Sequence, residues 1–525
     1  MFFTHKNLRA WCILLSLALL HACSTYNRVE VQYDPETLIS EGSGTLVYRG
    51  QEYPIFYPVI RGDTLLFSRV STRNVDGTTR YYKDNQRMSD TRTYRVHVDS
   101  SYGLNTTQQV LHIPQRAIVK AEFDEPRPGA VAANVFLGLL GFLVLVSAIA
   151  LATKKSCPFV YAYDSTGTRL EGEIYSGAIY PPIERDDYLH LPHLRAVDEQ
   201  YRVRLTNEVR EVQHTNLAEL WVIDHPEGVR TFIDKYGQIH ASAEPVAPAS
   251  AVSLEGEDVL GLVRYEDGRP YDSRIQKHGP LVDGVVLRFP CPADAQRAKL
   301  LIRAKNCFWL DYTLSAFYEH FGSTYGAWVE QQKTAEAEKL LAWSRDQHIP
   351  IAVSVRNDQS WELRDYFNIA GPLAMRHDVL ELPVSPTPDG YAEVKLEFGR
   401  HFWEVDWVAI DFGNDLVLKK TVVPLHQAHD GDGTPVRSAL LTTDDQYHTM
   451  ESIGDKAELV FDVPEMREDM QRSVFLHSRG HYEILHTPVG VPDVPFVSGF
   501  RKPGRFTEFA RDLLFRKIHE LQSTR

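Results

Sequence analysis

The sequence is poor in cysteine, with 5 among 525 residues, and no two of them form a C-x-x-C pair. The usual spacing of a structural zinc site is therefore absent. Cys12 lies in an N-terminal apolar run and Cys23 follows it, so Cys157, Cys291 and Cys307 remain for the mature chain. Three thiols allow at most one intramolecular disulfide, with Cys291 and Cys307 as the nearest pair, and three buried free thiols are the alternative.

The sequence also lacks the short motifs of common enzymes. It contains no G-x-S-x-G, no H-E-x-x-H, and neither G-x-x-x-x-G-K nor G-x-G-x-x-G, which leaves no hydrolase nucleophile motif or phosphate loop. No cofactor is predicted. The net charge of −14 and the lack of a basic run interleaved with aromatics argue against nucleic-acid binding.

Apolar and aromatic residues are plentiful, at 43% and 11% of the chain. Aromatic and β-branched side chains suit a pleated, half-buried surface. Short apolar runs separated by polar turns recur along most of the chain, as in FVYAYD and RLEGEIY around the turn 165–168, which predicts a hairpin. We expect a mainly β protein built from several β-sandwich or barrel modules.

One uncharged apolar run, residues 130–152, divides the chain and ends at Lys154 and Lys155. A helix of this length covers roughly 35 Å, enough for a hydrocarbon core of about 30 Å. We expect a transmembrane or membrane-associated helix here.

Residues 1–22 have the anatomy of a secretory signal, because Lys6 and Arg9 precede an apolar run that small residues follow. Leu20-His21-Ala22-Cys23 resembles the lipobox of bacterial lipoproteins, with the bulky His21 as its departure. The resemblance implies that Cys23 is acylated, with palmitate among the expected acyl groups, and begins the mature chain. Ser24, where an Asp would retain such a protein at the inner membrane, implies transfer to the outer membrane.

The wider arrangement is similar to a group of uncharacterised bacterial envelope lipoproteins. The similarity spans roughly residues 20–240 and is most specific in KKSCPFVYAYD, residues 154–164. It implies a membrane-anchored protein of the cell envelope and no particular activity.

The predicted organisation follows the changes of pattern along the chain. Beyond the signal, it comprises a small β domain at 23–128, the apolar helix at 130–152, a β domain at 153–250, strands and a long amphipathic helix at 251–347, a sandwich-like β domain at 348–500, and a C-terminal amphipathic helix at 505–522. The long helix is predicted over 311–347 from an aromatic stripe at spacings of three and four, weakened at Gly322 and Gly326. Such a stripe is more often a core face than a binding site, and the C-terminal helix is expected to pack on the last sandwich rather than on lipid.

The best metal candidate is the group His426, His429, Asp430 and Asp432, which is dense in ligand types but lacks the spacing of a known site. We therefore interpret it mainly as a hairpin turn.

Other polar groups are weaker candidates for metal binding or acid–base chemistry, and His225 is more simply a capped strand end. They are Asp186, Asp187, His190 and His193, the pair His477 and His481 around a presumed turn, and Asp406 with Asp411.

The leading hypothesis is a non-enzymatic, membrane-anchored envelope lipoprotein that binds or scaffolds a protein or glycan partner. One alternative is an envelope hydrolase, which requires a deep pocket with two carboxylates or converging His and Asp residues. Another is an accessory subunit of a membrane complex, which requires the 311–347 aromatic face to be exposed.

The location of residues 153–525 stays open between cytoplasm and periplasm. Lys154 and Lys155 favour the cytoplasm, whereas Ser24 favours the periplasm; we favour the outer membrane and periplasm.

Overall fold

The computed structural model describes residues 26–31, 43–70, 94–126, 158–357, 360–466 and 469–523. The chain divides into two compact units, residues 1–143 and 144–525. Cys23, Cys157 and the apolar run 130–152 lie outside the described residues. Within the described ranges, no helix has both the length and the apolar character needed to cross a bilayer. The described chain is mainly β and forms several sheets, as predicted.

The first unit contains one seven-stranded sheet in the order β1-β7-β5-β2-β3-β4-β6. Its strands are β1 (Tyr26–Val31), β2 (Ser43–Tyr48), β3 (Gln51–Arg61), β4 (Thr64–Ser68), β5 (Tyr94–Val98), β6 (Val110–Pro114) and β7 (Ile118–Pro126), with the 3₁₀ helix η1 (Gln115–Ala117) before the last. All pairs are antiparallel except β2 with β5. Leu46, Phe67 and Tyr94 are fully buried in its core, so apolar residues of distant strands meet on one face.

The large unit begins with two five-stranded sheets that enclose a common core. One has the order β24-β26-β11-β8-β9; the other is β10-β27-β12-β23, with β25 also paired to β12. Leu205, Leu220 and Leu476 belong to that core. The strands are β8 (Phe159–Asp164), β9 (Gly167–Glu173), β10 (Arg185–His190), β11 (Gln200–Thr206), β12 (Glu211–His225), β23 (Lys420–Val423), β24 (Gln427–Asp430), β25 (His448–Met450), β26 (Lys456–Asp462) and β27 (Gln471–Ile484).

Three further sheets, of five, three and two strands, belong to the described part of this unit. The orders of the first two are β15-β16-β21-β18-β19 and β20-β17-β22. A two-stranded sheet, β13 (Arg230–Ile233) and β14 (Ile239–Ser242), packs Phe232 against Leu301 and Trp407 of the three-stranded sheet. The remaining strands are β15 (Ser250–Ser253), β16 (Val282–Pro290), β17 (Arg297–Asn306), β18 (Ile351–Asn357), β19 (Ser360–Phe367), β20 (Arg376–Pro383), β21 (Tyr391–Gly399) and β22 (Trp403–Asp411).

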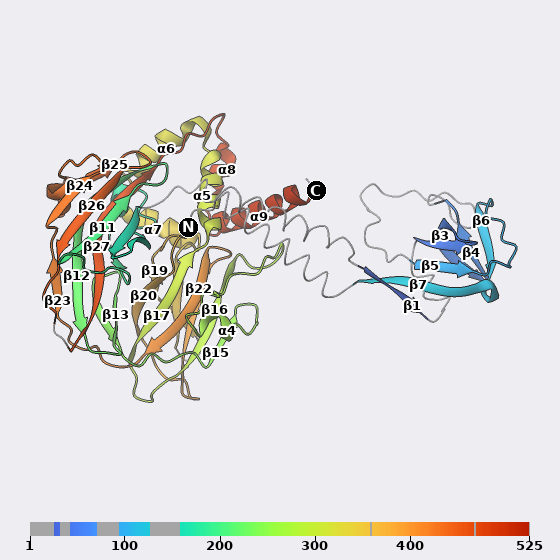
Figure 1. Ribbon diagram of the computed structural model, residues 1–525, viewed down its shortest axis with the longest axis horizontal. Coiled ribbons are helices and arrows are strands. Elements are labelled where there is room, and N and C mark those ends of the chain that lie inside the picture. Colours follow the sequence, from blue (N-terminus) through green and yellow to red (C-terminus); the bar gives the residue numbers. More distant parts are fainter. Residues whose placement is uncertain are drawn as a thin grey trace. The chain divides into compact units, whose positions relative to one another are not determined.

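The predicted hairpin is confirmed, because β8 and β9 pair antiparallel. The predicted boundaries at residues 250 and 347, however, do not separate sheets. β12 pairs along its length with β27, and β11 pairs with β26, so early and late segments lie side by side (Figure 1). The local patterns identify strands but contain no information about which distant strand completes each sheet.

The long helix predicted over 311–347 is three helices. They are α5 (Phe308–Glu319), α6 (Tyr325–Gln332) and α7 (Ala337–Asp346), with the 3₁₀ helix η3 (Gly322–Thr324) between the first two. Gly322 has a φ of +48°, a left-handed value that ends the α-helix there. The accessory-subunit alternative required an exposed aromatic face, and in the structure Phe317, Tyr318, Phe321 and Tyr325 are buried.

The remaining helices are α4 (Leu260–Val263), α8 (Val494–Gly499) and α9 (Arg505–Ser523), with η2 (Pro181–Ile183) and η4 (Arg437–Leu440) as 3₁₀ turns. α9 packs on protein, as predicted: Phe506, Phe509 and Leu514 are buried. The Phe506 amide and the Thr507 hydroxyl donate hydrogen bonds of 2.7 Å to the side chain and carbonyl of Gln347. In Figure 1, α5, α6, α8 and α9 lie together at one side of the sheets.

Candidate functional site

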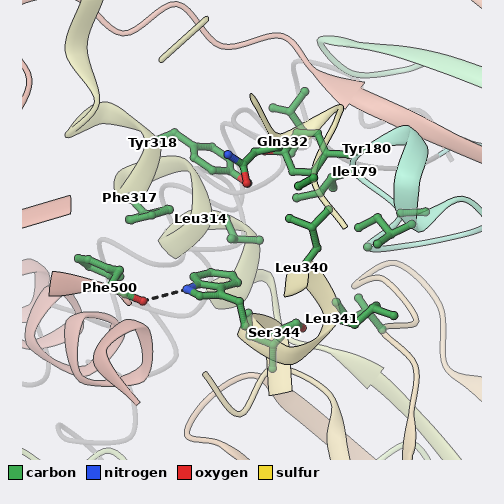
Figure 2. A pocket seen from close by; sticks show the side chains of 18 of the residues that line it. Ile179, Tyr180, Leu314, Phe317, Tyr318, Gln332, Leu340, Leu341, Ser344 and Phe500 are labelled. Carbon is green, nitrogen blue, oxygen red and sulfur yellow. Dashed lines mark hydrogen bonds between the residues drawn. The ribbon is translucent and has the colours of Figure 1, made fainter. Parts of the chain in front are cut away.

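The large unit contains a cavity of about 1180 Å³. Four helices line it, α5, α6, α7 and α8, together with segments near residues 176–185, 235–236 and 365–371. Figure 2 shows Ile179 and Tyr180, Leu314 and Phe317, and Leu340 arranged around one open space. The space is partly open to solvent and is large enough to admit a small molecule.

The helix α7 presents its apolar side chains to this cavity. Its sequence AEKLLAWSRD places Leu340, Leu341 and Trp343 in the lining, and none of its ten residues is fully buried. The Trp343 indole Nε1 donates a hydrogen bond of 2.9 Å to the Phe500 carbonyl, beside the Phe500 side chain in Figure 2. The helix is thus held in place through Trp343, while the Leu341 side chain remains 39% exposed at the cavity.

Aromatic side chains of α5 and α6 form another part of the wall. Phe317 is buried, and its ring centroid lies 4.6 Å from that of Phe500 and 6.4 Å from that of Trp328. Burial raises the pKa of the Tyr180 and Tyr318 phenols well above the usual value, so both stay neutral hydrogen-bond donors at any physiological pH.

Charged groups in the lining are mostly cationic and mostly paired. Lys235 binds the Asp365 carboxylate, and Lys339 binds Glu336 at 2.7 Å. Arg345 binds Glu338 at 2.8 Å, and Arg185 donates to the Ser176 and Ile369 carbonyls at 3.0 and 3.2 Å.

Arg501 also lines the cavity and is exposed to solvent. Within the described ranges no ion pair is found for its guanidinium. It is therefore the cation best placed to meet a negative group at the edge of the cavity.

The predicted metal candidate is a hairpin turn. The Asp430 carboxylate accepts hydrogen bonds from the amides of Asp432 and Thr434, at 3.0 and 2.8 Å, and so closes the turn after β24. His426 pairs with Asp462 at 3.0 Å instead of joining His429. The group does not converge on a point, as the turn interpretation predicted.

The residues of ERDDYLHLPHL lie in and after strand β10 rather than on one helix face. Asp187 is buried against Arg376, Asp186 accepts from His477 at 2.9 Å, and His193 pairs with Glu171 at 3.0 Å. Asp187 thus contacts Arg376 of β20 and His193 contacts Glu171 of β9, so these contacts run to other sheets, and of the four residues Asp186 and Asp187 line one small common pocket.

The carboxylates of the hydrolase alternative are likewise bound by neighbouring cations. Asp406 is fully buried and pairs with Arg303, and Asp411 lies 3.7 Å from the Lys299 ammonium. Neither lines the cavity.

His225 ends β12, with Nε2 3.0 Å from the Ser473 hydroxyl, so its predicted role at a strand end is confirmed.

Of the two alternatives left open for Cys291 and Cys307, the structure has the free thiols and not the disulfide. Cys307 is buried, and burial raises the pKa of its thiol far above the usual value. This thiol stays protonated and is no activated nucleophile.

Only part of the cavity lining could be predicted from the sequence. The aromatic stripe identified Leu314, Phe317 and Tyr318, although as a core face. Ile179 and Phe500 come from irregular segments without periodicity, so no pattern could have assigned them to the same cavity. His477 and His481 were misplaced at a turn; they lie inside β27.

Comparison with known proteins gives no match: no family model fits the chain, and no curated protein is similar to it in sequence. The assignment of function therefore depends on the geometry of the chain itself.

Proposed function

We propose that the chain is a membrane-anchored envelope lipoprotein whose large unit binds an amphipathic molecule with a long aliphatic part and an anionic end. The cavity is the observation that carries this proposal. Its volume of about 1180 Å³ is slightly above the range of about 300–1,000 Å³ for small-molecule sites. A ligand larger than a single sugar ring is therefore accommodated.

The chemistry of the lining favours an aliphatic ligand over the glycan of the sequence-based hypothesis. Leucine, isoleucine and aromatic side chains surround the space, and each methylene buried against them contributes about 0.8 kcal/mol. A glycan needs many polar partners, whereas the Lys235 and Arg185 side chains of this lining are already occupied by protein acceptors. Arg501 supplies the cation for an acidic head group.

The same lining supports binding rather than hydrolysis. Its only acidic residues are Asp311 and Asp365, the latter bound to Lys235, and it contains no histidine. A hydrolase of polysaccharide or peptide relies on two carboxylates or on histidines that converge on the bond to be cleaved.

The proposed location is the outer membrane or periplasm, with the anchor at Cys23. The lipobox-like sequence before Cys23 and Ser24 after it support this location. A lipid anchor would place an acyl-binding cavity close to a source of its ligand.

Titration of the purified protein with a fluorescent long-chain fatty acid tests the cavity. Leu341→Glu should weaken binding by about tenfold or more, because about 1.4 kcal/mol corresponds to tenfold and a carboxylate at an apolar wall costs at least that. Leu416→Glu is the matched control, since Leu341 and Leu416 are 39% and 46% exposed but only Leu341 lines the cavity. Equal affinity in the two variants, or no binding by the parent protein, would refute the proposal.

A second comparison tests the anionic end. Arg501→Ala should weaken binding of the fatty acid while leaving binding of the alcohol of the same chain length unchanged. If both probes lose affinity equally, the guanidinium contributes to the shape of the site and not to recognition of charge.

A further inference from the structure

A second group of chemically active side chains lies in the sheet β10-β27-β12, apart from the residues that line the cavity. His214 of β12 stands directly opposite His481 of β27 in the antiparallel register. Glu483 is two residues beyond His481 on the same strand, and alternate residues of a strand point to the same face. The register therefore brings two imidazoles and one carboxylate together from distant parts of the chain.

The three side chains are close enough to share one ion. One ligand atom of each lies within 4.8 Å of the others. Nε2 of His214 is 3.9 Å from Oε1 of Glu483, and the two imidazole rings stack with centroids 4.7 Å apart. Small rotations of the side chains bring these atoms to the separations found around a bound metal ion.

Each imidazole is oriented by a partner on its other nitrogen. Nδ1 of His481 lies 3.1 Å from a carboxylate oxygen of Glu184, and Nδ1 of His214 lies 3.2 Å from the Thr449 hydroxyl. Glu184 can only accept, so His481 donates from Nδ1, and the lone pair of its Nε2 is left available. A carboxylate behind a histidine is the arrangement that fixes metal-binding imidazoles.

Glu184 is itself firmly held. The Tyr447 hydroxyl and the Arg479 guanidinium each donate to it at 2.7 Å. The orientation of His481 is therefore built into the sheet.

The site is reachable and its histidines are suited to ligation. The side chains of His214 and Glu483 are 21% and 23% exposed, and that of His481 is 6% exposed. The imidazole of His214 and the carboxylate of Glu483 can therefore be approached by an ion from solvent.

Lys333 of α6 lies at the edge of the group and is compatible with an ion. Its ammonium contacts Oε2 of Glu483 at 2.8 Å and Glu330 at 3.0 Å. Oε1 of Glu483 faces His214, so the carboxylate can bind an ion through Oε1 and keep Lys333 on Oε2.

We propose that His214, His481 and Glu483 form a binding site for a divalent transition-metal ion, with Zn²⁺ as the best fit. Two imidazoles and one carboxylate are ligands that Zn²⁺ accepts in sites that keep a fourth position open to water. Mg²⁺ and Ca²⁺ are disfavoured because they require six or more oxygen ligands.

Calorimetric titration of the chelator-treated, full-length protein with Zn²⁺ tests this site, and Co²⁺ absorption reports its coordination. We expect binding of one ion and a visible Co²⁺ spectrum of low coordination number. His214→Gln and His481→Gln should each lower Zn²⁺ affinity by a hundredfold or more, and Thr449→Ala by about tenfold, in line with losses of outer partners. Lys333→Met should raise affinity, because it removes a competing cation.

His426→Gln is the control, since that histidine belongs to the dense cluster that sequence alone favoured and should leave Zn²⁺ binding unchanged. If the histidine variants fail to fold, Glu483→Gln tests the Zn²⁺ site instead, because it alters a partly exposed residue. Absence of Zn²⁺ binding by the parent protein overturns the proposal, as does loss of binding in His426→Gln with retention in Glu483→Gln.

Discussion

Some histidines of the large unit are held by partners from neighbouring strands, and His477 shows why such roles were hard to predict. His477 of β27 lies 2.9 Å from both Asp186 and Glu219, which belong to the strands on either side. Although burial opposes the effect, the hydrogen bonds to these carboxylates raise the pKa of His477. Its chain neighbours, Leu476 and Ser478, give no indication of this environment.

His190 of β10 shows the opposite effect, and its titration should be visible in stability. Burial, followed by the charges of His377 and Arg230, lowers the pKa of His190 to about 4 from 6.5. The His190 imidazole is therefore protonated near pH 6.5 in the unfolded chain but only near pH 4 in the folded chain. The contribution to stability is complete above pH 6.5 and is lost as the pH falls toward 4.

We therefore expect His190→Gln to change the pH dependence of unfolding. Between pH 7 and pH 4 the parent should lose about 3 kcal/mol more stability than the variant, since one pKa unit corresponds to about 1.4 kcal/mol. Urea unfolding followed by tryptophan fluorescence measures this, because every tryptophan beyond the signal segment lies in the large unit. His278→Gln, an exposed histidine, is the control, and parallel curves for parent and His190→Gln would contradict the argument.

At the scale of elements, local sequence patterns predicted the strands but did not predict where the helices end. The β8–β9 hairpin follows from two apolar runs around a polar turn, and both strands form as predicted. The aromatic periodicity of 311–347 continues across Gly322, so it predicted one helix where the backbone breaks. The part of the cavity lined by irregular segments could not be predicted from the sequence. Periodicity identifies the faces of a single helix or strand, whereas residues from several elements line the cavity.

Gly322 and Gly326 offer a matched test of that break. An alanine Cβ at Gly322 would lie 2.5 Å from the Gly490 carbonyl oxygen on a backbone with φ of +48°, whereas at Gly326 it would meet nothing within 4 Å. Gly322→Ala should lower the free energy of unfolding by at least about 1–2 kcal/mol. Gly326→Ala, inside α6, should raise it by about 0.5–1 kcal/mol.

The two changes have opposite signs and are measured by the same urea unfolding curves. If Gly322→Ala were neutral, the positive φ would not be required, and the continuous helix predicted from the sequence would be the better description.

At the scale of the whole molecule, two different lipid contacts were predicted from the sequence, an acylated Cys23 and the run 130–152. Cys23→Ser combined with deletion of 130–152 should move the protein from the membrane fraction to the soluble fraction, because both apolar contacts are removed. Cys291→Ser, which alters a thiol inside the large unit, should leave fractionation unchanged. Membrane association of the double variant, measured by flotation in a density gradient, would exclude both anchors as the cause.

The pairing of β12 with β27 has a consequence for biogenesis. The chain is synthesised from its N-terminus, so β10, β11 and β12 exist with exposed edges before β26 and β27 can pair with them. Unpaired strand edges and late-forming contacts promote aggregation and slow folding. A chain cut short before residue 471 would lack β27 and would therefore leave β10 and β12 without that strand partner.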